Sequence, residues 1–438
     1  MHASHSAHES FAGYRHGIRD NLAQFLHQLV QVFLVGLTLG MMRTVVPALA
    51  ESEFGVPKGS FLLLMAFVVA FGFVKGTLNF VAGRLSERLG RKTVLLLGWA
   101  SAIPIPFMIL YAPSWGWIVA ATVLLGMNQG FTWSMTQTAK LDITRADQRG
   151  LTMGLNEFSG YVGVAIAGII TGYLATALGP RMGLFVFGAV VIVTALVLTA
   201  LWVKETLAWA HAEGARHAAG MNAGPTARFA KTISGKPTTW EVFTLMSWRD
   251  KRMAALSQAG LVEKFVDALI WVVYPVYLYE RGLSLAHIGW VVGVYGFVWG
   301  GSQFFTGRLS DRIGRHKPIV WGTWLCGIGV VMMLAVDQVW GWVLSAAVTG
   351  FGMALLYPNL SAAVADIAHP NWRGSAIGIY RFWRDIGYGI GALALGLVAH
   401  LTGNLTSGLW FVAIAMALSG LLVQLWCEET HPRLNPAH

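Results

Sequence analysis

The chain carries the sequence GRLSERLGRK at residues 83–92 and a near copy, GRLSDRIGRHK, at residues 307–317. Each copy directly follows an apolar run of helical length, which predicts a tight basic loop between two membrane helices. Shifting the chain by 224 residues aligns residues 72–92 with residues 296–316, with twelve identities in 21 positions. The same shift aligns four further residues with their counterparts: Asp142, Ile143, Arg149 and Gly150 with Asp366, Ile367, Arg373 and Gly374. The repeat predicts two related halves with any substrate site near the midplane between them.

The composition is typical of a membrane protein. Of the 438 residues, 55% are hydrophobic and only 12% are charged, whereas soluble domains carry roughly 25% charged residues. The mean hydropathy is +0.57. Apolar runs of about 20 residues recur, each long enough to cross the bilayer as a helix that bonds its own backbone groups. We therefore predict an all-α polytopic membrane protein embedded in the lipid bilayer.

The hydropathy pattern predicts twelve transmembrane helices in two six-helix bundles. We place the spans at about 22–48, 59–82, 93–111, 115–139, 151–177, 182–203, 253–279, 286–306, 318–336, 340–364, 375–399 and 407–426. The predicted regions are an N-terminal tail at 1–21, a bundle at 22–203, a linker at 204–252, a second bundle at 253–426 and a C-terminal tail at 427–438. The linker is predicted to hold a surface helix near Trp240 to Trp248.

The basic residues predict the orientation. The formal net charge of +10 lies mostly in short connections, so it indicates topology and no nucleic-acid partner. The loops at 83–92, 140–150, 307–317 and 365–374 hold twelve Lys and Arg residues. The six opposite loops hold only Lys58, Arg181 and Arg281. We therefore expect a multi-pass protein of the cytoplasmic (inner) membrane, with the first four loops and both termini in the cytoplasm.

The doubled loop resembles the signature of the major facilitator superfamily, G-x-L-x-D-R-x-G-R-[RK]. The matching residues of the first copy are Gly83, Leu85, Arg88, Gly90, Arg91 and Lys92, and those of the second include Gly307, Asp311, Arg312, Gly314 and Arg315. Glu87 replaces the usual Asp in the first copy. The resemblance extends over nearly the whole chain in length, helix count and repeat. It implies a secondary active transporter that works by alternating access.

The resemblance also implies that the loops hold the cytoplasmic side closed. An acidic side chain accepts hydrogen bonds from free amides at a helix N-terminus, so Glu87 is expected near Gly374 and Asp311 near Gly150. Other family patterns are missing. Gly126 stands where a frequent Arg is found, and residues 151–177 contain no proline. These departures weaken the case for a standard multidrug antiporter.

Charged residues inside predicted spans are functional candidates, because each costs several kcal/mol unless it is paired or hydrated. They are Arg43, Lys75, Glu157, Glu263, Lys264, Asp267, Arg381, Arg384 and Asp385. For proton coupling the first choice is Glu157, which the repeat sets opposite Arg381, and the alternative is a packing Glu bonded to Asn156 or Asn79. The further candidates for proton coupling are Glu263, Asp267 and Asp385.

The basic residues in the spans suggest a gate or a substrate contact. Arg43 and Asp267 are predicted to face each other as an outer gate. The resemblance implies that the second and eleventh spans pack together between the halves, so Lys75 is predicted to pair with Asp385 there. Arg381 and Arg384 are substrate or gate candidates, with local pairing to Asp385 as the alternative. Aromatic residues near the midplane are candidates for stacking a substrate or are packing core: Trp133, Tyr161, Tyr274, Tyr295, Trp299, Tyr357 and Trp383.

Enzymatic chemistry has no support in the motifs. The sequence has no Walker, dinucleotide-binding or HExxH pattern, and we expect neither a cofactor nor a metal. Cys326 and Cys427 are expected to be buried thiols, and His2, His5 and His8 a solvated tail. The favoured function is therefore a monomeric, proton-coupled transporter of a small solute, with export of a drug-like or metabolic compound slightly preferred. The alternatives are a transporter of small organic anions or anionic complexes, and a membrane receptor or accessory protein that moves nothing.

Overall fold

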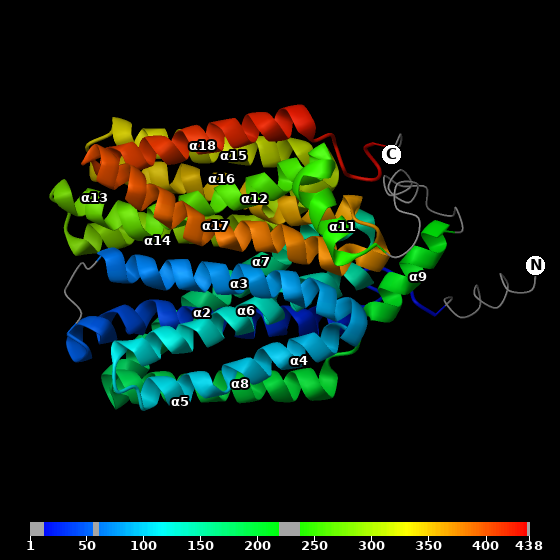
Figure 1. The fold of residues 1–438 in the computed structure, drawn as a ribbon, viewed down its shortest axis with the longest axis horizontal. Coiled ribbons are helices and arrows are strands. Elements are labelled where there is room, and N and C mark those ends of the chain that lie inside the picture. Colours follow the sequence, from blue (N-terminus) through cyan, green and yellow to red (C-terminus); the bar gives the residue numbers. More distant parts are fainter. Residues whose placement is uncertain (1–12, 56–60, 219–236, 436–438) are drawn as a thin grey trace, which may run out of the picture.

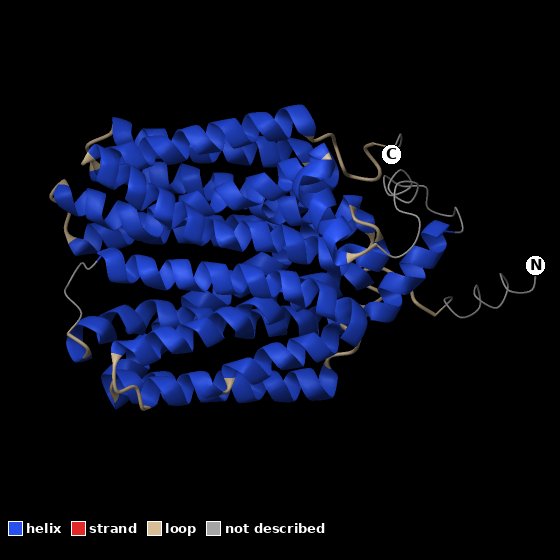
Figure 2. Ribbon diagram, viewed as in Figure 1, coloured by secondary structure: helices blue, strands red, loops and turns tan. Residues whose placement is uncertain are grey.

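The computed structural model describes residues 13–55, 61–218 and 237–435. The described chain is helical and contains no strand (Figure 2). The first bundle consists of α2 (Leu22–Glu53), α3 (Phe61–Leu89), α4 (Arg91–Ala102), α5 (Pro104–Leu110), α6 (Trp115–Ile143), α7 (Arg149–Leu178) and α8 (Pro180–Trp202). The second consists of α12 (Lys251–Ala268), α13 (Tyr274–Glu280), α14 (Leu285–Ile313), α15 (His316–Ala335), α16 (Val339–Ile367), α17 (Arg373–Thr402) and α18 (Leu405–Trp426). The helices run lengthwise and roughly parallel or antiparallel to one another (Figure 1).

The predicted spans correspond to helical segments of the structure. Eight segments of the described chain are long and apolar enough to cross a membrane by composition alone. The other segments, namely α3, α6, α14 and α12 with α13, lie in the same bundles and carry buried polar residues such as Lys75 and Lys264. The predicted all-α membrane fold is confirmed.

Two predicted spans are interrupted helices. The third span is divided into α4 and α5 at Ile103, directly before Pro104. Ile103 keeps helical φ and ψ of −51° and −43°, but proline lacks a backbone N–H and so interrupts the α-helical hydrogen-bond pattern at this position. The seventh span passes from α12 through a π-helical turn, η3 (Leu269–Val273), into α13, where Pro275 occupies the first turn.

The repeat is visible in the helix boundaries. The 224-residue shift maps α3, α6 and α7 onto α14, α16 and α17 at both ends. It also maps Gly90 onto Gly314, with φ of +90° and +97°, in the turns that follow α3 and α14. An L residue with a side chain rarely adopts such a φ, so glycine permits both turns. The two halves therefore share their local geometry and not only their helix order.

Each half contributes to two long interfaces, which we call seams. One seam is α3 against α17, and the other is α7 against α14; α3 and α17 lie side by side in Figure 1. We call the end of the molecule with residues 83–92 and 307–317 the motif end, and the opposite end the far end. At the motif end a Cβ on Gly83 would clash with the Gly374 carbonyl, and one on Gly307 with the Gly150 carbonyl. Glycine thus lets the halves touch backbone to backbone there.

The linker forms helices at the motif end. They are α9 (Leu207–Ala218), α11 (Thr239–Thr244) and a π-helical turn, η2 (Leu245–Arg249). The predicted surface helix near Trp240 to Trp248 is present, and both tryptophans are exposed. Helix α9 was missed, because its sequence is rich in Ala and His and lies inside a polar stretch. Figure 1 shows α9 and α11 at the same end of the bundle as the described chain termini.

Candidate functional site

The two motif acids bind helix N-termini across the seams. Glu87 Oε1 accepts a hydrogen bond from the Ser375 amide at 2.7 Å. Asp311 accepts from the amides of Gly150 and Leu151 at 2.9 and 2.7 Å. These amides lie in the first turns of α17 and α7, where N–H groups have no partner within the helix and the helix dipole favours an acid. The contacts predicted near Gly374 and Gly150 are therefore present, with one amide bond on Glu87 and two on Asp311.

Arginines and acids extend this closure at the motif end. Arg91 binds Asp142 at 2.9 Å, and its repeat counterpart Arg315 binds Asp366 at 3.0 Å. Asp366 also binds Arg149 of the other half at 2.9 Å. These side chains are buried, and an unpaired charge costs more free energy in the interior than at the surface, so each ion pair stabilises the closed arrangement. The motif end is closed in this conformation.

Glu213 of α9 joins the two halves and was not predicted. Its carboxylate binds Arg149 at 2.9 Å and Arg373 at 2.8 Å. Arg149 and Arg373 are repeat counterparts that begin α7 and α17. The linker is therefore part of the closure, and no repeat or motif in the sequence marks Glu213 as a partner.

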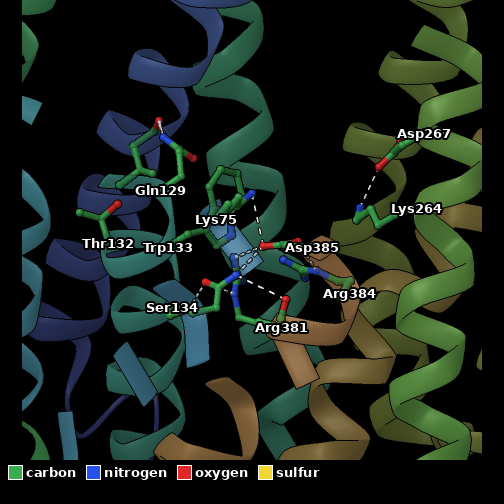
Figure 3. Close-up of polar contacts among 12 residues, drawn as sticks. Lys75, Gln129, Thr132, Trp133, Ser134, Lys264, Asp267, Arg381, Arg384 and Asp385 are labelled. Carbon is green, nitrogen blue, oxygen red and sulfur yellow. Dashed lines mark hydrogen bonds and ion pairs between the residues drawn. The ribbon is translucent and has the colours of Figure 1, made fainter. Parts of the chain in front are cut away.

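Four charged residues form what we call the ionic cluster: Lys75, Arg381, Arg384 and Asp385. Asp385 lies 3.6 Å from Lys75 Nζ, 3.6 Å from Arg381 Nη2 and 3.0 Å from Arg384 Nε. Lys75 comes from α3 and the others from α17, so the predicted Lys75–Asp385 pair crosses a seam (Figure 3). The local pairing of both arginines with Asp385 is present as well.

Neutral polar residues fix the geometry of Asp385. Asn79 Nδ2 donates to Asp385 at 2.7 Å, and Asn79 Oδ1 accepts from Ser134 Oγ at 2.6 Å and from Arg381 Nε at 3.3 Å. Ser134 lies on α6, beside Trp133 in Figure 3. The sequence predicts Asn79 only as a partner of Glu157 and does not single out Ser134. The feature of the sequence that marks Ser134 is the unusual number of amide and hydroxyl side chains in residues 128–138.

The ionic cluster has an excess of positive charge. It holds three cations and one carboxylate, and all four side chains are at least nine-tenths buried. The Nη1 and Nη2 atoms of Arg381 and Arg384 have no hydrogen-bond partner among the described residues. Buried donors of this kind are costly unless a ligand or water completes them. The arrangement is suited to hold one further anion, because guanidinium groups match planar acid groups.

A second cluster surrounds Lys264. Its Nζ lies 2.8 Å from Asp267 and 3.5 Å from Glu263, and the Tyr295 hydroxyl donates to Asp267 at 2.7 Å. Both Glu263 oxygens lack hydrogen-bond partners in the described chain. Glu263 and Asp267 were predicted to share a face, and the structure places one lysine against both. Arg43, the predicted partner of Asp267, lies in α2, but its side chain falls outside the described part.

Glu157 is buried among neutral donors. Its Oε1 accepts from Trp133 Nε1 at 3.0 Å, from Asn156 Nδ2 at 2.9 Å and from Gln137 Nε2. Its Oε2 has no partner in the described part of the chain. None of the described ion pairs joins it to Arg381, which faces Asp385 instead. The predicted opposition of Glu157 and Arg381 is therefore not a direct contact in this conformation.

Five of the predicted aromatic residues form a contiguous group, in which the Tyr295 and Trp299 ring centroids lie 5.6 Å apart. Tyr161 lies 5.9 Å from Trp133, 4.3 Å from Trp299 and 6.4 Å from Tyr357 between ring centroids. Lys264 Nζ stands 4.3 Å from the Tyr357 centroid, and Arg384 Cζ stands 4.8 Å from it. This aromatic group therefore adjoins both charged clusters.

The remaining candidates lie elsewhere. Tyr274 is buried in α13, and none of the described hydrogen bonds, ion pairs or ring contacts joins it to the aromatic group. Trp383 instead faces the linker, where it donates to Ser247 at 2.9 Å. The thiols of Cys326 and Cys427 are free and buried, as predicted. His2, His5 and His8 lie outside the described residues.

Comparisons with known proteins agree with the repeat and the fold. The sequence profile of the Major Facilitator Superfamily matches residues 29–262 and 256–437. The uncharacterized MFS-type transporter STM4428 of Salmonella typhimurium is 24% identical, covering 90% of this chain and 93% of the relative. The class G tetracycline resistance protein of Vibrio anguillarum is 25% identical, covering 77% of this chain and 80% of the relative.

A solved structure shows the same architecture. The human organic anion transporter MFSD10 superposes with a TM-score of 0.76 at 17% identity, covering 92% of this chain and 99% of that chain. At this identity the likeness shows the fold alone. The profile match, the doubled loop and the paired bundles lead to one conclusion: the chain belongs to the Major Facilitator Superfamily.

Proposed function

We propose that the chain is a secondary active transporter of a small organic anion, coupled to protons and working by alternating access. The observation that carries the proposal is the ionic cluster. Lys75, Arg381 and Arg384 surround the single carboxylate of Asp385, and four guanidinium nitrogens lack hydrogen-bond partners in the described chain. A neutral or cationic solute leaves this excess charge unmet, whereas an acid group offers acceptors for it.

Alternating access follows from where the closure lies. The described contacts between halves at the motif end include those of Glu87 with Ser375, Asp311 with Gly150, and Arg149 with Asp366. The ionic cluster lies deeper, along the seam of α3 and α17. For the anion to leave at the motif end, these contacts must break while the halves rock about the site. With the motif end in the cytoplasm, as the basic loops predict, this conformation is closed to the cytoplasm.

The charges of the site favour binding an anion together with a proton. The two charged clusters and Glu157 hold four basic and four acidic side chains, all buried. An added monoanion leaves one negative charge in excess, and protonation of one carboxylate removes it. Because each makes the other easier to bind, anion and proton are expected to move in the same direction.

Glu263 is the carboxylate best placed to take this proton. It shares Lys264 with Asp267, and Asp267 has the closer contact, at 2.8 against 3.5 Å. The Glu263 oxygens have no hydrogen-bond partners in the described part of the molecule. Glu157, the first choice from sequence, already accepts three N–H groups. We therefore assign the proton to Glu263 and keep Glu157→Gln as the matched comparison.

Export is the second candidate direction, and the sequence slightly favours it. The observation that favours it is the likeness to a tetracycline resistance protein over most of both chains. An inside-negative membrane potential also expels anions, by about 2.3 kcal/mol per charge at 100 mV. A drug-like or metabolic substrate, and a receptor that binds without transport, are the remaining alternatives.

Uptake into proteoliposomes under opposite pH gradients tests the proposal. The probe is radiolabelled benzenesulfonate, a strong acid that stays ionised and does not cross lipid as a neutral molecule. With the membrane potential clamped by potassium and valinomycin, an acidic exterior should drive accumulation. An acidic interior driving accumulation would instead support proton-anion exchange, as in export. Uptake that ignores both gradients contradicts proton coupling, and binding without uptake supports the receptor alternative.

The same assay tests Glu263. Glu263→Gln should abolish accumulation driven by the gradient and leave exchange of labelled for unlabelled anion intact. Glu157→Gln should keep the gradient dependence. The opposite pattern would return the proton to Glu157, and unchanged accumulation in both variants would exclude both residues.

A further inference from the structure

The repeat places different chemistry at equivalent points of the two seams. Lys75 and Asp385 meet at 3.6 Å across the seam of α3 and α17. The 224-residue shift maps Lys75 onto Trp299 and Asp385 onto Tyr161. These two rings meet across the seam of α7 and α14, with centroids 4.3 Å apart. At one depth of the molecule, one seam is therefore ionic and the other aromatic.

The aromatic seam contains polar atoms without partners. Trp299 Nε1 and both amide atoms of Gln303, one helical turn further along α14, have no hydrogen-bond partner within the described residues. Both side chains are buried. Asn79, the repeat counterpart of Gln303, is by contrast bonded to Asp385 and Ser134. Buried polar groups left unpaired in a native structure indicate a missing ligand or water, so this seam is incomplete without one.

The two seams are close enough to hold one small molecule. Arg384 Cζ lies 4.8 Å from the Tyr357 centroid, and the Tyr357 and Trp299 centroids lie 5.3 Å apart. One residue, Tyr357, therefore separates the arginine from the aromatic seam. An acid group at Arg384 and a ring beside Trp299 fit in a single compound of about one ring in size.

We propose that the transported anion is aromatic, with its acid group on Arg381 and Arg384 and its ring between Tyr161 and Trp299. This inference rests on the proposed anion transport. Tyr161 belongs to the first half and Trp299 to the second, so a motion that parts the halves also parts the rings. The ring of the substrate then takes the place of the contact between the Tyr161 and Trp299 rings. Gln303 and Trp299 Nε1 offer hydrogen-bond partners to a polar substituent on that ring.

Binding of two matched acids to the purified protein tests the inference. Benzoate and cyclohexanecarboxylate carry the same acid group on rings of similar size, and only one ring is aromatic. Isothermal titration calorimetry at pH 7 should show benzoate binding about two- to tenfold tighter, the range for one aromatic contact. Trp299→Leu and Tyr161→Leu should each remove this preference. Trp290→Leu, an exposed aromatic change on the same helix, should keep it.

The outcomes test the aromatic nature of the substrate separately from anion transport itself. Equal affinity for both acids in the wild type, no binding of either, or a preference that survives in both seam variants overturns the aromatic inference. Accumulation of benzenesulfonate then decides separately whether anion transport stands. If Trp299→Leu fails to fold, Tyr161→Leu carries the test, because Tyr161 is only half-buried and lies on the other half. Arg384→Gln should weaken both acids alike.

Discussion

Lys75 and Asp385 belong to opposite halves of the chain, and their Nζ and Oδ2 atoms lie 3.6 Å apart in the middle of the bundle. The pair is buried. Asp385 is also the only acid among the described ion pairs of Arg381 and Arg384. One carboxylate thus holds the ionic seam together, and under the proposed function a substrate anion shares the two arginines with it.

Asp385→Asn should destabilise the protein more than Lys75→Met. The asparagine leaves three buried cations without a carboxylate, and breaking such a cluster costs about 3–5 kcal/mol. Lys75→Met leaves Asp385 with two arginines and should cost less. Thermal unfolding of the purified protein measures both. Benzoate should recover part of the loss in Asp385→Asn, and equal unfolding temperatures for the two variants would contradict the unequal dependence on Asp385.

Glu213→Gln should loosen the motif end without unfolding the bundles. The change removes the charge that binds Arg149 and Arg373 in opposite halves, so the closed conformation loses its contact with the linker. The measurement is the rate of maleimide labelling at Ser375→Cys, a buried position beside Glu87, with Cys326 and Cys427 replaced by Ser. Labelling should be faster in Glu213→Gln and unchanged in Glu280→Gln, an exposed acid at the far end. An unchanged labelling rate would mean that α9 contacts both halves at the motif end without stabilising the closed conformation.

Asp311→Asn should weaken the closed conformation more than Glu87→Gln. Asp311 accepts two backbone amides and pairs with Arg315 at 2.6 Å. Glu87 accepts one amide and pairs with the partly exposed Arg84 at 3.0 Å. Hydrogen bonds to charged groups are worth about 1.5–3 kcal/mol each, so the difference should appear as faster labelling of the same Ser375→Cys reporter in Asp311→Asn. Faster labelling in Glu87→Gln than in Asp311→Asn would contradict the prediction that the acid with more amide bonds contributes more to the closed conformation.

Acid should detach α9 from the N-terminal segment through His16. Arg216 donates to His16 Nδ1 at 2.6 Å, and His16 Nε2 faces the Trp209 carbonyl at 3.2 Å, so the bonded imidazole is neutral. Burial first, and then Arg216 and Arg373, hold the pKa of His16 below its ordinary 6.5, while Glu213 opposes them. The folded pKa is lowered, so this contact stabilises above about pH 6.5 and is lost as the pH falls through the folded pKa.

Hydrogen exchange of residues 207–218 measures this effect. After correction for the intrinsic exchange rate, protection should fall between pH 7.5 and pH 5.5 in the wild type. His16→Asn, which does not titrate in this range, should show no such fall. Equal protection of the wild type at both pH values would count against His16 as the cause.

The fold was predictable because its signals are local or repeated. Apolar runs define the helices, and the resemblance carried by the doubled loop implies the contacts of Asp311 with Gly150 and of Lys75 with Asp385, which the structure contains. The contacts of Glu213, Ser134 and Lys264 were not predictable, because they depend on helix rotation and on how a nonrepeated linker packs. The proposed preference for Glu263 over Glu157 rests on their hydrogen-bond partners, which the sequence does not show, because both acids simply lie within predicted spans.

The most direct test of the account is the pH inside proteoliposomes, reported by trapped pyranine, after benzenesulfonate is added outside. No gradient is imposed, and the membrane potential is clamped. We predict that the wild type acidifies the interior, because each anion enters with a proton, and that Arg384→Gln does not. Anion uptake by the wild type without acidification, or with a rise in internal pH, would contradict the central claim.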